Sequence, residues 1–120
     1  MKLVIGGACQ GKAEFVRRKF KKEPQKCNEN TALTASCING YHNLIADLLQ
    51  ANKNPQEFTK KLIVENPDVI IICDEVGLGI VPLDAFQRQW REEVGRCLCL
   101  IAEKSDYVCR ILAGLENRIK

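Results

Sequence analysis

The sequence predicts an α/β fold in which a mostly parallel sheet is flanked by helices. Three observations favour it: predicted strands alternate with predicted helices, a glycine-rich segment at 6–11 joins the first strand to the first helix, and residues 69–72 form a β-branched apolar run. Such a run is typical of a strand buried between two helical layers. Because the chain has 120 residues, we expect one domain over 1–120.

The first 50 residues predict two strands and two helices. Residues 2–6 form a short apolar strand, and the glycine-rich segment leads into a helix over about 12–22. The polar residues 24–30 end this pattern. Residues 31–37 alternate weakly between apolar and polar side chains and predict a short strand. Asn39 is expected to cap the next helix, whose apolar residues recur at helical spacing: Tyr41, Leu44, Ile45, Leu48 and Leu49.

A sharper helix signal begins at Asn54. Asparagine at the cap, Pro55 at the first helical position and Glu57 at the third together predict a helix start. Pro67 ends this helix.

The second half of the chain predicts two further strands around a long helix. Residues 68–74 are expected to form a strand in the interior of the sheet. A helix over about 83–104 follows, then a strand over 106–113, and Gly114 begins a charged tail. One stripe of the long helix is apolar: Leu83, Phe86, Trp90, Val94, Leu98 and Ile101.

Composition excludes several classes of protein. Hydrophobic residues make up 46% and charged residues 28%, which excludes wholesale disorder and collagen-like or coiled-coil chains. The apolar run 69–73, like every other in the sequence, is far shorter than the roughly 20 residues of a membrane span. No signal-peptide pattern is present either, so we expect a cytoplasmic protein without a membrane partner. The seven cysteines include no C-x-x-C pair, which favours reduced, mostly buried thiols.

The positive charge is concentrated in one segment. Residues 17–26 contain six lysines and arginines and one glutamate, although the net charge of the whole chain is only +3. Nucleic-acid surfaces interleave such charges with aromatic side chains, and Phe20 is the only aromatic residue here. We therefore expect a solvated helix end near a phosphate site and no nucleic-acid partner.

Residues 6–13 match the phosphate-binding pattern G-x-x-x-x-G-K, with Ala13 where serine or threonine is usual. The loop lies between a strand and a helix, so its backbone N–H groups and the helix N-terminus can hold phosphates while Lys12 reaches the terminal ones. Ala13 lacks the hydroxyl that normally binds Mg²⁺. The alternative is a tight turn with an incidental lysine. The predicted nucleotide-binding residues are Gly6, Gly7, Ala8, Cys9, Gln10, Gly11, Lys12 and Ala13.

Asp74 and Glu75 follow the apolar strand, as the carboxylates of a nucleotide site do. Such side chains hold the Mg²⁺ shell or polarise a nucleophile, although acids often end strands for no functional reason. We predict Lys12 and Glu75 as catalytic and Asp74 and Glu75 as metal-binding. Cys9 is read as a small loop side chain, with a redox switch as the alternative. His42 is read as a solvent-facing or packed ring rather than a catalytic base.

Two blocks of sequence resemble the bifunctional adenosylcobinamide kinase and adenosylcobinamide-phosphate guanylyltransferase family of cobalamin biosynthesis. Residues 3–12, LVIGGACQGK, look like that family's strand and G-G-A-R-S-G-K-S loop. Residues 75–82, EVGLGIVP, resemble its N-E-V-G-x-G-I-V-P motif, and the likeness continues through WREEVGR at 90–96 and AGL at 113–115. The likeness covers about half of the chain.

The resemblance implies a RecA-like P-loop NTPase fold, reduced in size, and a trimer as the homo-oligomer. It implies that ATP or GTP, with Mg²⁺, phosphorylates a hydroxyl of a corrinoid substrate. It also implies a second reaction, in which GMP is first attached to a histidine of the enzyme and is then transferred to the phosphorylated corrinoid. By position, Gly7, Gly11 and Lys12 would bind phosphates, and Glu75 would lie at the metal and phosphoryl site.

The sequence also departs from the family pattern. Cys9, Gln10 and Ala13 replace Arg, Ser and Ser in the loop, and Asp74 replaces Asn. The family segment that contains the accepting histidine, H-R-x-x-R-P-x-x-W-x-T-x-E, has no counterpart in residues 23–32. We therefore predict a shortened, divergent member that binds a purine nucleotide and has lost guanylyl transfer. The alternative is a catalytically degraded homologue that acts as a nucleotide sensor or an oligomeric interaction protein.

Overall fold

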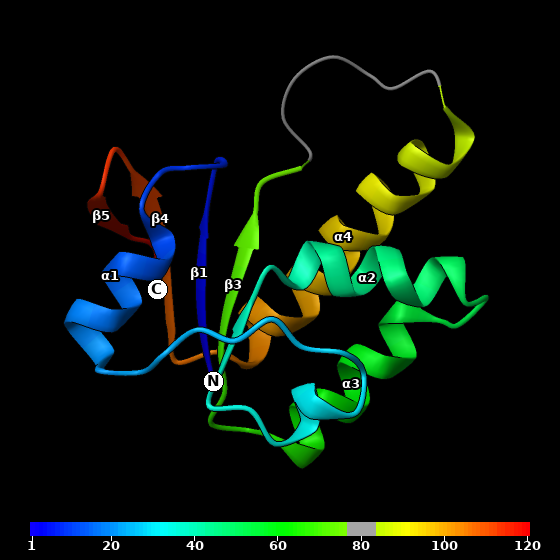
Figure 1. Cartoon of the computed structure of the whole chain (residues 1–120), viewed down its shortest axis with the longest axis horizontal. Helices are drawn as coiled ribbons and strands as arrows, with labels where there is room; N and C mark the ends of the chain where they lie inside the picture. The colour runs from blue at the N-terminus through cyan, green and yellow to red at the C-terminus, as the bar shows by residue number, and fades with distance from the viewer. Residues whose placement is uncertain (77–83) are drawn as a thin grey trace.

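The structure, a computed structural model, describes residues 1–76 and 84–120, which form one sheet with helices on both faces (Figure 1). The strands are β1 (Lys2–Gly6), β2 (Cys37–Asn39), β3 (Ile70–Asp74), β4 (Tyr107–Leu112) and β5 (Leu115–Arg118). The helices are α1 (Lys12–Phe20), α2 (Tyr41–Gln50), α3 (Pro55–Glu65) and α4 (Ala85–Lys104), with a 3₁₀ turn η1 (Thr31–Leu33). The predicted start of the long helix at Leu83 lies outside the described residues.

The predicted mostly parallel sheet is confirmed. Its strand order is β2-β3-β1-β4-β5, in which β1 pairs in parallel with both β3 and β4, and β2 pairs in parallel with β3. Only the last pairing, between β4 and β5, is antiparallel among the described strands. The strand predicted at 68–74 lies between β2 and β1, inside the sheet as expected.

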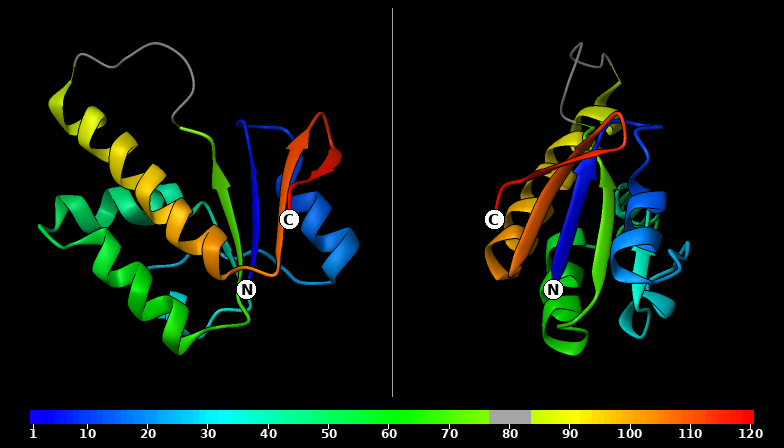
Figure 2. Two further views of the ribbon diagram at one scale, coloured as in Figure 1. Left: turned by 180° about the vertical axis from the view of Figure 1, so that it is seen from behind. Right: turned by 90° about the vertical axis from the view of Figure 1, so that its left-hand side faces the viewer.

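The two faces of the sheet carry cores of unequal size. Leu3 of β1 points into the larger core together with buried residues of α2, α3 and α4, whereas its neighbour Val4 points into the smaller core with Phe15 and Val16 of α1. The edge-on view in Figure 2 shows α1 on one side of the sheet and α4 on the other. Successive residues of each inner strand are therefore buried on opposite faces, which explains the uninterrupted apolar run of β3.

The strand predicted over 31–37 is wrong in its first part. Residues 31–33 form η1, because the side chain of Asn28 accepts hydrogen bonds from the backbone N–H groups of Asn30 and Thr31 (both 2.9 Å), and Thr31 Oγ1 accepts from Asn28 N–H. Such local side-chain bonds compete with strand pairing. The strand begins only at Cys37.

Asn39 does not cap α2. It remains paired in β2, where its N–H donates to the carbonyl of Gln25 at 2.8 Å, and Gly40 occupies the cap position with a φ of 77°. Gln25 forms a single parallel bridge with Ile38 and so covers part of the outer edge of β2. By contrast, the predicted cap of α3 is confirmed, since Asn54 Oδ1 accepts from the N–H groups of Gln56 and Glu57.

The charged tail predicted after Gly114 is in fact β5. Ala113 and Gly114 have φ angles of 50° and 77°, so the chain reverses in two residues and returns along β4. A two-residue turn with positive φ at both positions matches the twist of an antiparallel hairpin.

The cysteines are free thiols, and four of the seven are buried. Burial raises the pKa of Cys37 and Cys73 to about 12 and that of Cys97 and Cys109 to about 11. These four thiols pack as small apolar side chains. Within the described part of the chain, no helix combines the length and apolar character of a membrane span.

Candidate phosphate-binding site

The candidate site lies where β1 and β3 end and α1 begins. Parallel strands place their carboxyl ends at one edge of a sheet, and ligands of α/β proteins bind at that edge. A cleft of about 370 Å³ opens there. Five of the eight predicted loop residues line it, Cys9 to Ala13, together with Asn39 and Asp74.

The loop backbone is tightly fixed at both ends. Gly6 lies against β4 so closely that an added Cβ would come within 2.6 Å of the carbonyl oxygen of Ile111. Gly11 has a φ of 89° at the N-terminus of α1, and its carbonyl accepts from Phe15 N–H. Two of the pattern's glycines are therefore required by the local geometry.

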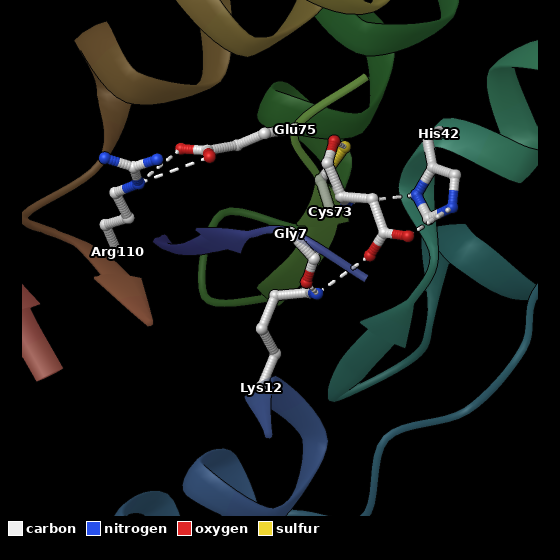
Figure 3. A network of polar contacts seen from close by, with 7 residues as sticks. Gly7, Lys12, His42, Cys73, Glu75 and Arg110 are labelled. Carbon is white, nitrogen blue, oxygen red and sulfur yellow. Dashed lines mark hydrogen bonds and ion pairs between the residues drawn. The ribbon is translucent and has the colours of Figure 1, made fainter. Parts of the chain in front are cut away.

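Lys12 lies folded back over the loop. Its side chain is only 7% exposed, and Nζ donates to the carbonyl of Gly7 at 2.5 Å and lies 2.8 Å from Asp74 Oδ1 (Figure 3). The structure thus brings together the predicted phosphate-binding lysine and the predicted metal-binding aspartate. Of the remaining loop residues, Ala8 and Cys9 are exposed.

Asp74 has a second partner that the sequence analysis missed. Its backbone N–H donates to His42 Nδ1 at 3.1 Å, and its Oδ2 lies 3.4 Å from His42 Nε2. Because Nδ1 accepts a hydrogen bond, the proton of the neutral ring belongs on Nε2, facing the carboxylate. Burial lowers the pKa of His42, against the opposing effect of the nearby Asp74 charge, which favours this neutral form.

A positional signal for His42 was present in the sequence. It lies in the first turn of α2, directly after a strand that runs parallel to β3. Residues just beyond the carboxyl ends of neighbouring parallel strands lie close together, so His42 was within reach of Asp74.

Glu75 lies apart from this cluster. Its carboxylate is 15% exposed and is paired with Arg110 of β4, whose Nε lies 3.0 Å from Oε1 and 3.2 Å from Oε2 (Figure 3). Successive strand residues point to opposite faces. Asp74 therefore faces the α1 side with Lys12, and Glu75 faces the side of the larger core.

Gln10 joins the loop to the β4–β5 turn. Its side-chain Oε1 accepts from Ala113 N–H at 2.6 Å, and its backbone carbonyl accepts from Gly114 N–H at 2.9 Å. The tip of the loop is therefore held by the hairpin, a contact that the phosphate-binding pattern alone does not predict.

The site offers one carboxylate beside the lysine for a cation. No group of three or more His, Cys, Asp and Glu side chains lies close enough to hold a metal ion within residues 1–76 and 84–120. Mg²⁺ keeps several waters and is commonly bound through one or two carboxylates and the substrate phosphates. Asp74, 28% exposed and lining the cleft, fits this kind of binding.

The chain is similar to known proteins of one kind. A family model described as cobinamide kinase / cobinamide phosphate guanyltransferase matches residues 22–119. The bifunctional adenosylcobalamin biosynthesis protein CobP of Pseudomonas aeruginosa is 36% identical over 52 residues, which are 43% of this chain and 30% of that protein. The aligned part thus spans under a third of the relative's length. The phosphate loop precedes the range that the family model matches, so its assignment rests on its pattern and geometry.

Proposed function

Because the chain belongs to the cobinamide kinase / cobinamide phosphate guanyltransferase family, we propose that it binds a purine nucleoside triphosphate on residues 6–13. We propose further that it transfers the γ-phosphate of ATP or GTP to the hydroxyl of a cobinamide-type corrinoid, as an enzyme of cobalamin biosynthesis.

The contact between Lys12 and Asp74 at the phosphate loop carries this proposal. A buried lysine at the start of a helix, 2.8 Å from a carboxylate that ends the neighbouring strand, is an arrangement suited to triphosphate and cation together. The 370 Å³ cleft gives the phosphates access to both side chains.

Phosphoryl transfer needs positioning and charge stabilisation rather than a covalent intermediate. In the proposed reaction the loop N–H groups and Lys12 hold the phosphates, and Asp74 orients the water shell of Mg²⁺. The cation, when bound, neutralises charge on the phosphate oxygens. Glu75 is the candidate for orienting the acceptor hydroxyl or completing the metal shell, and Arg110 fixes its carboxylate.

We propose that guanylyl transfer is absent. A guanylylated histidine needs a ring nitrogen with a free lone pair, and His42 is the one histidine of the sequence. Its Nδ1 accepts from Asp74 N–H and its Nε2 faces the Asp74 carboxylate, so both nitrogens are engaged. This supports the expectation drawn from the missing family segment.

Ala13 favours a second candidate function. Its methyl group lines the cleft and packs against the smaller core, at the position where a hydroxyl normally binds Mg²⁺. A protein that binds nucleotide without transferring phosphate, as a sensor or an interaction partner, is consistent with that substitution.

Phosphate transfer tests the proposed function directly. The full chain is incubated with Mg²⁺, adenosylcobinamide and γ-labelled ATP or GTP, and label in the corrinoid is measured after chromatography. We expect labelled corrinoid from the wild type and none from Lys12→Ala, and no acid-labile protein adduct from α-labelled GTP. Nucleotide binding without label transfer favours the sensor, whereas a GMP adduct contradicts the loss of guanylyl transfer.

A further inference from the structure

Asp74 is held from two sides by different elements. Lys12 of α1 lies 2.8 Å from Oδ1, and His42 of α2 lies 3.4 Å from Oδ2. His42 also accepts from the backbone N–H of the same aspartate at 3.1 Å. One imidazole therefore contacts both the main chain and the side chain of Asp74.

A bound triphosphate competes with Asp74 for one of these two partners, Lys12. In the structure, the ammonium of Lys12 donates a hydrogen bond to the Gly7 carbonyl and forms an ion pair with Asp74. A terminal phosphate at the loop competes for the same ammonium, because a phosphate carries more charge than a carboxylate. Asp74 would then lose the contact on Oδ1 and keep only the one on Oδ2.

His42 is itself well anchored. Its side chain is 12% exposed, and its backbone carbonyl accepts a hydrogen bond from Trp90 Nε1 of α4 at 2.7 Å. The centroids of the His42 and Trp90 rings lie 6.3 Å apart. A side chain fixed in this way loses little conformational freedom when it holds a neighbour.

We propose that His42 is a positioning residue, which keeps the Asp74 carboxylate directed at the cleft once Lys12 has turned to the phosphates. In the nucleotide-bound state the Nε2–H group, which now lies 3.4 Å from Oδ2, donates to that oxygen and leaves Oδ1 free for the water shell of a cation. This inference rests on the proposed nucleotide binding, and it assigns His42 a role without requiring it to touch the nucleotide.

Calorimetric titration of the full chain with ATP, in excess Mg²⁺ and again in EDTA, tests the role of His42. We expect Mg²⁺ to tighten binding by the wild type. In His42→Ala this gain should fall by about tenfold, the effect of losing a hydrogen bond to a charged group, while the affinity in EDTA stays unchanged. His42→Gln retains an N–H donor and should recover most of the gain.

Two further variants separate positioning from folding. Asn43→Ala changes an exposed residue in the same helical turn and should leave both affinities unchanged. Trp90→Phe removes the donor to the His42 carbonyl, together with part of the ring that packs against the larger core. It should reduce the Mg²⁺ gain, but by less than His42→Ala does.

The outcomes distinguish this inference from the proposed function. Absence of ATP binding by the wild type overturns both. A wild type that binds ATP with no gain from Mg²⁺ overturns the positioning role and leaves nucleotide binding intact. The role is also overturned if His42→Ala keeps the full gain, or if it weakens binding equally in Mg²⁺ and EDTA, as a general structural defect would.

Discussion

Ala13 and Lys12 are neighbours in sequence but contribute opposite properties to the site. Lys12 brings a buried positive charge next to the loop. Ala13 brings only a methyl group, which is partly buried against the smaller core. The loop therefore has a positive charge that can bind phosphates, but residue 13 supplies no oxygen ligand for the accompanying cation.

Restoring that oxygen should strengthen the response to Mg²⁺. We expect Ala13→Ser to raise the ratio of ATP affinity in Mg²⁺ to that in EDTA by roughly fivefold, about 1 kcal/mol for one added ligand or hydrogen bond. Titration calorimetry measures both affinities. Ala51→Ser, at an exposed position that ends α2 and does not line the cleft, is the matched control. An Mg²⁺ response identical to that of the wild type would show that residue 13 does not face the cation.

Single residues were predicted from the sequence only where a local pattern marked them. Lys12 and Asp74 could be found because glycine spacing and the end of an apolar run identify them. The roles of His42 and Arg110 had no such local pattern, because each depends on a partner from another element, 32 and 35 residues away respectively. The position of His42 just after a strand became informative only once that strand was known to pair with β3. Such partners follow from strand order and register, which the sequence leaves open.

The contact between the phosphate loop and the β4–β5 hairpin links two elements from opposite ends of the chain. Ala113 N–H and Gly114 N–H both donate to Gln10, one to its side chain and one to its backbone. The loop tip is therefore fixed before any ligand binds, which reduces the ordering cost of phosphate binding.

Loss of the Gln10 side-chain contact should weaken nucleotide binding. Gln10→Ala removes the acceptor for Ala113 N–H, and we expect ATP affinity to fall by about fivefold, as for the loss of one hydrogen bond. Gln10→Met fills a similar volume without an acceptor oxygen and should show the same loss. If both variants bind ATP as the wild type does, the hairpin does not order the loop.

Elements with a strong local signal were predicted well. The cap of α3 follows from Asn54 and Pro55, and the buried character of β3 follows from its isoleucines. β5 was missed because all four of its residues are exposed, so it has no apolar alternation to reveal it. It is held by pairing with β4 instead.

At the scale of the whole molecule, one sheet joins two cores. Adjacent residues of β1, β3 and β4 are buried on opposite faces, so neither core can open without disturbing the strands that the other needs. The single domain over 1–120 stays a prediction. The trimer expected from the family resemblance stays a prediction.

Because the two cores share their strands, we expect the protein to unfold in a single cooperative transition. We expect urea unfolding followed by circular dichroism and by the fluorescence of Trp90, the one tryptophan of the sequence, to give coincident curves. Ile111→Val, in the smaller core, should lower stability by about 1 kcal/mol in both signals, although Trp90 packs against the larger core. A Trp90 transition that does not move would show that the two cores unfold separately.

Equilibrium binding of ATP and GTP in Mg²⁺ tests the central claim, that residues 6–13 with Lys12 form a nucleotide site, most directly. We predict binding by the wild type, unchanged binding by Lys22→Ala at an exposed lysine just after α1, and at least about a tenfold loss in Lys12→Ala. No binding at millimolar nucleotide, or wild-type affinity in Lys12→Ala, would contradict the claim.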